Sequence, residues 1–83
     1  MAMNMDQISI PANTVTLVAG NVRQLTVTNT STTSTIYLGE YGVSTTAYGV
    51  ALAPGASVHI GDLPVNFYGY ATSAAVLSIL YIL

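Results

Sequence analysis

The chain ends in a nearly unbroken apolar run, AAVLSILYIL, which extends from Ala74 to Leu83. A transmembrane helix needs about 20 apolar residues, so this run is too short to span a bilayer. As a strand it would carry apolar side chains on both faces, a pattern typical of strands that are covered on two sides. We therefore predict a final strand over residues 74–83 that needs a covering layer on each face.

The rest of the chain is typical of an all-β protein. It contains eleven threonines and many Val, Ile and Tyr residues, which favour the half-buried surface of a sheet. Period-two alternation predicts further strands near residues 7–10, 14–19, 22–29, 36–38, 56–60 and 67–72. Turn signals separate them at residues 20–21, 29–35, 54–55 and 61–64. We expect about six to eight short strands in a small antiparallel β-sandwich or barrel of jelly-roll or immunoglobulin-like type.

A chain of 83 residues is expected to form one domain. We assign residues 14–83 to a single β-sandwich domain, and residues 1–13 either to its first strand or to an arm that pairs with a neighbouring subunit. The N-terminus lacks the basic and apolar segments of a signal peptide, so synthesis in the cytoplasm is expected. The glycosylation acceptor at Asn29 is accordingly interpreted as a coincidence.

Charged residues are scarce, at 5% of the chain, and there is no lysine or cysteine. Nucleic-acid binding requires many basic side chains that neutralise phosphates, and this chain has one arginine, so that function is excluded. Adsorption to anionic lipid fails for the same reason, and no membrane partner is expected. A small domain without disulfides commonly gains stability by oligomerisation. We therefore expect a homo-oligomer whose surface is largely covered by neighbours.

The final strand is the first candidate for a subunit interface. In a two-layer sandwich only one of its faces has a partner in the same chain, so the other face, with Val76, Leu80 and Ile82 or the odd-numbered set, needs a subunit. Loops that fold over this face are the alternative. Tyr68, Tyr70 and Arg23 are assigned to the same interface. By alternation Arg23 shares a face with Leu25 and Val27, where its side chain can extend from the core edge into solvent or pair with Asp62, Asp6 or Glu40. We expect an ion pair within the chain or between subunits, and a contact with a ligand is the alternative.

Catalytic chemistry is not indicated by the sequence. Ser57, His59 and Asp62 lie close together, but no nucleophile elbow or oxyanion-hole motif accompanies them. The carboxylates and the histidine lack the spacing of metal ligands, and no glycine-rich phosphate loop is present. We expect no enzyme activity, no cofactor and no metal.

Tyr41 and Tyr48, in the irregular segment between residues 40 and 52, are candidates for a contact loop. Tyrosines offer large contact area and one hydrogen-bonding tip, which suits protein interfaces. They also stack against sugar rings, although a sugar site usually adds several Asn, Asp or Trp side chains. The loop is therefore predicted to contact a protein partner or, as the alternative, a glycan.

The segment from Arg23 to Gly55 resembles small β-sandwich virion structural proteins of tailed bacteriophages. The resemblance rests on the stretches LTVTN, IYLG, GV and GVALAPG, and on an aromatic-alanine pair before an apolar last strand. The matching positions are Leu25, Val27, Asn29, Tyr37, Leu38, Gly39, Gly42, Val43, Gly49, Leu52, Pro54, Gly55, Tyr70 and Ala71. It covers about two-thirds of the chain.

This resemblance implies a capsid decoration or cement protein that binds the major capsid protein and stabilises the shell. Such proteins are often trimers and usually have no catalytic residues. The implied location is the capsid surface of the virion, after synthesis in the host cytoplasm. The alternative is a module of a head or tail fibre that binds a glycan of the host surface.

Overall fold

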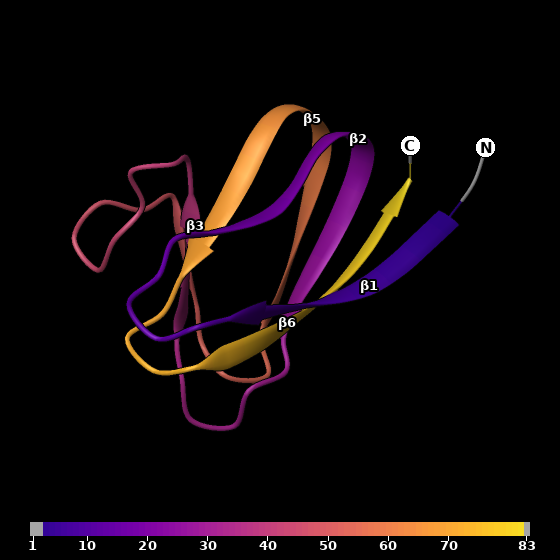
Figure 1. Cartoon of the computed structure of the whole chain (residues 1–83). Helices are drawn as coiled ribbons and strands as arrows, with labels where there is room; N and C mark the ends of the chain where they lie inside the picture. Colours follow the sequence, from indigo (N-terminus) through magenta and orange to yellow (C-terminus); the bar gives the residue numbers. More distant parts are fainter. Residues whose placement is uncertain (1–2, 83) are drawn as a thin grey trace.

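Six antiparallel strands make up the structure, a computed structural model that describes residues 3–82 (Figure 1). They are β1 (Met3–Ile10), β2 (Thr16–Asn29), β3 (Ile36–Gly39), β4 (Val50–Leu52), β5 (Ser57–Tyr70) and β6 (Ala75–Ile82). Hydrogen bonding joins them into one sheet in the order β1-β6-β2-β5-β3-β4. The prediction of a small all-β protein with antiparallel strands is confirmed.

The long strands β2 and β5 give the sheet its two layers. Each has 14 residues, and they pair with each other over nearly their whole length. The second half of β2 also pairs with β6, whereas the end of β5 pairs with β3. One half of this ribbon therefore extends the layer of β1 and β6, and the other half extends the layer of β3 and β4.

The ribbon bends at the two places where turns were predicted, and those two predictions were wrong. The signals at residues 20–21 and 61–64 were expected to end strands, but β2 and β5 both continue through them. Asn21 has φ of 56° and Asp62 has φ of 42°, and the β2–β5 register shifts beside Asn21, between Gly20 and Val22. Residues in the left-handed region can form a β-bulge, which bends a strand without ending it. The presence of Asn21 and Asp62 correctly indicated left-handed backbone, but here that backbone bends two continuous strands and does not end them.

The turn at Pro54-Gly55 is confirmed. Gly55 has φ of 81°, and the Ala56 amide donates to the carbonyl oxygen of Ala53 at 3.0 Å. A positive φ at the third residue of a four-residue turn is the property of type II turns that favours glycine there.

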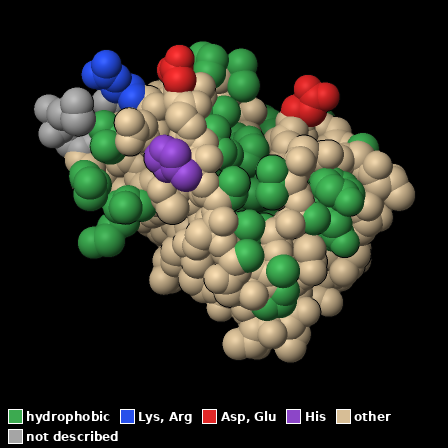
Figure 2. All heavy atoms as spheres, turned by 180° about the vertical axis from the view of Figure 1, so that it is seen from behind, with side chains coloured by type: hydrophobic (Ala, Val, Ile, Leu, Met, Phe, Trp, Pro, Cys, Tyr) green, Lys and Arg blue, Asp and Glu red, His purple; other side chains and the backbone are tan. Residues whose placement is uncertain are grey.

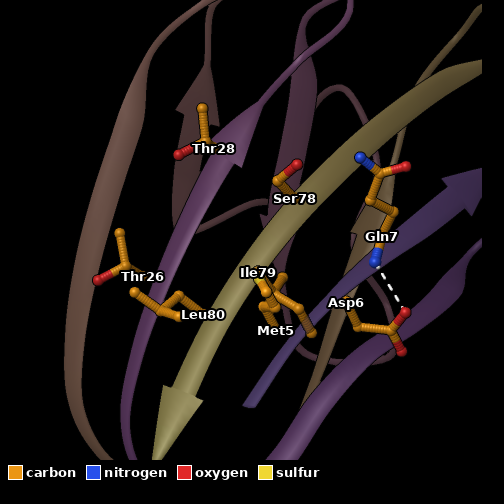
Figure 3. A pocket seen from close by; sticks show the side chains of 8 residues that line it. All are labelled: Met5, Asp6, Gln7, Thr26, Thr28, Ser78, Ile79 and Leu80. Carbon is orange, nitrogen blue, oxygen red and sulfur yellow. Dashed lines mark hydrogen bonds between the residues drawn. The ribbon is translucent and has the colours of Figure 1, made fainter. Parts of the chain in front are cut away.

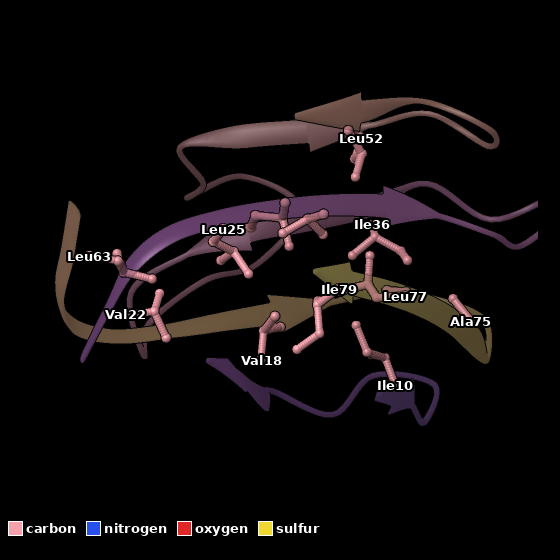
Figure 4. Packing of buried hydrophobic residues seen from close by; sticks show 13 residues of the cluster. Ile10, Val18, Val22, Leu25, Ile36, Leu52, Leu63, Ala75, Leu77 and Ile79 are labelled. Atoms are coloured by element: carbon pink, nitrogen blue, oxygen red, sulfur yellow. The ribbon is translucent and has the colours of Figure 1, made fainter. Parts of the chain in front are cut away.

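The core lies between the two layers (Figure 4). Leu25 and Val27 of β2, Leu38 of β3 and Leu77 of β6 have no exposed surface. Burial of each such side chain contributes about 1.5–3 kcal/mol to folding. The cluster comprises Ile10, Val18, Val22, Leu25, Val27, Ile36, Leu38, Leu52, Leu63, Ala71, Ala75, Leu77 and Ile79.

The N-terminal segment from Met3 onward forms the first strand of the sheet. β1 pairs with β6 along its length, from Met3 opposite Ile82 to Ile10 opposite Ala75. Only Ile10 of this strand is buried, and Ile8 packs partly against the core. Of the two alternatives for residues 1–13, the structure shows a first strand within the same chain, with residues 1–2 outside the described range.

A buried side-chain amide closes the end of the sandwich. Asn29 Nδ2 donates to the carbonyl oxygens of Ser34 at 2.7 Å and Leu52 at 2.8 Å. Its Oδ1 accepts from the Ser31 amide at 3.0 Å. Asn29 thus joins the end of β2 to the following loop and to β4. Asn29 Nδ2, the atom to which a glycan would be attached, is therefore buried, and both of its hydrogens are donated within the folded protein.

We predict that Asn29→Ala destabilises the fold by about 2–3 kcal/mol, because it leaves buried carbonyl groups without donors. Urea unfolding followed by circular dichroism measures the change. The exposed Asn66 is the matched control, and Asn66→Ala should change stability by no more than about 0.5 kcal/mol. Equal effects of the two substitutions would contradict the role given to Asn29.

Two glycines at the bend allow a second prediction. A Cβ on Gly20 would lie 3.0 Å from the Asn66 Cα and 3.1 Å from the Val65 carbonyl oxygen, whereas a Cβ on Gly61 meets nothing within 4 Å. Gly20→Ala should therefore cost about 1–3 kcal/mol through overpacking against backbone, and Gly61→Ala should be nearly neutral. Thermal unfolding of both variants compares them, and a neutral Gly20→Ala would show that the two strands are less closely packed than described.

Candidate functional site

Strand β6 buries Ala75, Leu77 and Ile79, half-buries Tyr81 on the same side, and presents its even-numbered side chains outward. Leu77 is fully buried, and Ile79 is 5% exposed. Val76 and Ile82 are half-buried on the opposite side, and Leu80 is 41% exposed. The structure thus identifies Val76, Leu80 and Ile82 as the set that the molecule's own second layer does not cover.

Neighbouring strands extend this outer surface on both sides. Leu80 stands between Met5 of β1 and Thr26 of β2, and Met5 is 83% exposed. A groove of about 580 Å³ runs here, lined by side chains of β1, β2 and β6 (Figure 3). We call this surface the β6 face and define it by Met3, Met5, Gln7, Thr26, Thr28, Ser57, His59, Val76, Ser78, Leu80 and Ile82.

Four polar side chains of the β6 face are paired with one another. Thr28 Oγ1 and Ser57 Oγ are 2.7 Å apart, and Thr26 Oγ1 lies 3.1 Å from His59 Nδ1. These pairs stand directly opposite each other in the β2–β5 register. Covering such groups costs less than covering polar groups that depend on water. No Asp, Glu, Lys or Arg belongs to the β6 face, and the Asp6 carboxylate at its rim accepts from the Gln7 amide at 2.8 Å.

The other layer presents an outer surface rich in tyrosine. Tyr37 of β3 stands opposite Tyr70 of β5, and Tyr68 lies two residues before Tyr70 on the same face. The Tyr41 ring contacts the Tyr68 ring edge-on at 5.3 Å, and the Tyr48 ring contacts the Tyr37 ring at 5.0 Å. We call this surface, which also includes Leu17, the tyrosine face. Tyr41 is 72% exposed and Tyr48 is 50% exposed.

The residues predicted for one interface therefore lie on two surfaces. Val76, Leu80 and Ile82 belong to the β6 face, whereas Tyr68 and Tyr70 belong to the tyrosine face. The outer faces of a two-layer sandwich point away from each other, so one flat partner surface does not cover both sets. The Tyr70 hydroxyl also has a local role, because it donates to Asn13 Oδ1 at 3.0 Å.

Arg23 is exposed, at the end of the buried stretch of β2. Val22 and Leu25 are both buried, and the two residues between them are exposed, so period-two alternation is interrupted at this point. Arg23 lies beside the bend, between residues that pair with Leu63 and Gly61, and so across from Asp62. Within residues 3–82 Arg23 forms no ion pair with Asp62, Asp6 or Glu40. The pairing between subunits stays a prediction.

The segment between β3 and β4 is irregular but internally bonded. The Val43 amide donates to the Glu40 carbonyl oxygen at 2.9 Å, and the Ser44 amide donates to that of Ala47 at 2.8 Å. Ser44 Oγ accepts from the Ala47 amide at 3.2 Å, and the buried Val43 anchors the segment to the core side. We call the depression of about 480 Å³ in this segment the loop hollow; it is lined by Gly39, Glu40, Gly42, Val43, Ala47, Tyr48 and Gly49.

Sequence reasoning named Tyr41 and Tyr48 in this segment but missed Glu40 as a lining residue. The available signal was that Glu40 is the only charged residue between Arg23 and Asp62 apart from the single His59. In a chain with so few charged residues, a single carboxylate in a glycine-containing loop is a candidate for binding a polar or cationic group of a partner. Met5 and Thr26 were also missed as neighbours of Leu80, because strand order cannot be read from one strand alone.

Ser57 and His59 do not interact with each other. Each faces a threonine of β2 instead, as described above, and Asp62 lies beyond them at the bend. Residues 3–82 contain no cluster of three histidine or carboxylate side chains that could hold a metal ion.

The described part of the chain has no helix with the length and apolar character required to cross a membrane.

Comparisons with known proteins identify no relative of this chain. No family model, curated protein or solved structure matches this chain.

Proposed function

We propose that this chain is a structural subunit of a tailed-bacteriophage virion, of the capsid decoration or cement type, which self-associates and binds the major capsid protein. The observation that carries the proposal is the β6 face, an uncharged surface with exposed apolar side chains on strands whose other side forms the core. The resemblance of residues 23–55 to phage virion proteins supports the same class. No catalytic role is part of the proposal.

Self-association is the simplest use of the β6 face. Its apolar side chains, Met5 and Leu80 above all, gain about 25 cal/mol for each Å² removed from water. The Thr28–Ser57 and Thr26–His59 hydrogen bonds can persist when the face is covered. A second copy brings no like charge to this surface, because the face has no acidic or basic side chain other than His59. In the view of Figure 2 the charged side chains lie along one edge, and hydrophobic side chains are exposed over much of the remaining surface.

A trimer is the expected assembly. Subunits in a ring meet through two different patches, and a ring of three encloses the shared surface at its axis. Three copies that bring their β6 faces toward the axis would cover Leu80 and Ile82. The tyrosine face would then point outward, toward the shell or the next subunit. This arrangement uses both halves of the predicted interface, each for a different contact.

We predict that the purified protein is a trimer and that Leu80→Asp dissociates it, because a carboxylate would have to be buried at the contact. Light scattering coupled to size-exclusion chromatography measures the mass, and circular dichroism checks that the variant remains folded. Leu17→Asp is the matched control, since Leu17 is 51% exposed on the tyrosine face. If Leu17→Asp dissociates the protein and Leu80→Asp does not, the subunit contact lies on the tyrosine face and not on the β6 face. A monomeric unsubstituted protein would contradict self-association.

The virion assignment is tested by the number of copies in purified particles that contain this chain. A decoration protein follows the capsid lattice, so its copy number should be on the order of hundreds per particle. Quantitative mass spectrometry against the major capsid protein gives this ratio. A few copies per particle would indicate the fibre module instead, and absence from the particles would overturn the proposal.

A further inference from the structure

The loop hollow holds one negative charge without a basic neighbour. Glu40 is its only charged lining residue. Arg23, the one arginine, lies in β2 beside the bend, and His59 lies on the β6 face. Within residues 3–82 no basic group comes within 4.0 Å of the Glu40 carboxylate. Glu40 is exposed, so its carboxylate is accessible to a cationic group of another molecule.

An aromatic side chain lines the same hollow. Tyr48 lines the hollow and is 50% exposed, and its ring is held against Tyr37 at an interplanar angle of 53°. A cation over the face of a tyrosine ring is attracted by the ring quadrupole. The hollow thus combines the two groups that recognise a planar cation, a carboxylate and an aromatic face.

The walls of the hollow are formed before any ligand arrives. Gly39, Gly42 and Gly49 contribute no side chains, so the depression stays open, and a Cβ on Gly42 would meet nothing within 4 Å. The Gly49 amide donates to the Leu38 carbonyl oxygen at 2.8 Å and fixes the end of the loop to β3. A preorganised loop loses less conformational entropy on binding than a mobile one.

We propose that the loop hollow receives the guanidinium group of an arginine side chain presented by a partner protein. Guanidinium is planar, pairs with a carboxylate and stacks on aromatic rings, so it matches Glu40 and Tyr48 together. A sugar fits less well, because the hollow has no Asn, Gln, Asp or Trp side chain to bind several hydroxyl groups. An anionic ligand is repelled by Glu40. This inference goes beyond the proposed function and does not require self-association.

The test is a titration of the ¹⁵N-labelled full-length protein followed by NMR. The probe is N-acetyl-arginine amide, and the matched control ligand is N-acetyl-citrulline amide, which has nearly the same shape without the charge. We expect shifts of the amide signals of residues 39–49 with arginine, at a dissociation constant on the order of 10 mM, and much smaller shifts with citrulline. A third titration with neutral hexoses covers the glycan alternative.

Two variants locate the site. Glu40→Gln preserves shape and should weaken arginine binding about tenfold, and Tyr48→Leu should weaken it by a smaller factor. Asp62→Asn is the matched control, because it removes a carboxylate outside the hollow and should leave binding unchanged. The dispersion of amide signals outside residues 39–49 reports whether each variant keeps its fold.

Three results would overturn the proposal. Equal shifts with citrulline and arginine would show that charge is not recognised. Equal loss of binding in Asp62→Asn and Glu40→Gln would indicate attraction to net charge only. Shifts in the hollow with a hexose but not with arginine would assign it to sugar binding instead. Loss of arginine binding in Glu40→Gln alone supports the site whether or not the protein forms a trimer.

Discussion

The corner in the β2–β5 ribbon is the constraint on which the rest of the structure depends. Asn21 and Asp62 adopt left-handed backbone on adjacent strands, beside the paired residues Val22 and Leu63. Both strands bend together there, and one hydrogen-bonded sheet becomes two layers. Without the bend, the core side chains of β3 and β6 would lie along one flat surface instead of facing each other. The two outer faces, with their different chemistry, are a consequence of the same corner.

Side-chain alternation in the sequence was sufficient to predict the class of fold and much of the core. Thr26 and Thr28 face outward and Leu25 and Val27 inward, as alternation indicated, and β6 was located with one buried and one outward set. These predictions succeed because the period of two is a local property of an extended chain. The choice between the two faces of β6 requires strand order, which depends on contacts between residues far apart in the sequence.

The errors share a physical origin. Glycine, Asn and Asp indicate left-handed backbone, but the same conformation serves a hairpin turn and a β-bulge, and only the pairing of the next residues separates them. The buried positions of β2 also change from even-numbered to odd-numbered residues between Val22 and Leu25, next to this bend. Likewise, the order in residues 40–49 comes from main-chain hydrogen bonds and from Val43. A sequence pattern without periodicity does not reveal such bonds.

The two edges of the sheet are unequal, and this limits how copies can add to one another through main-chain pairing. β1 offers an edge of eight residues, whereas β4, at the other edge, has three. Polymerisation into a fibre requires a long edge at each end of the unit. Pairing of β1 with β1 of a second copy uses both long edges and terminates after two molecules. Many proteins protect their edges with lysine; in this chain, which has none, strand length itself prevents open-ended growth.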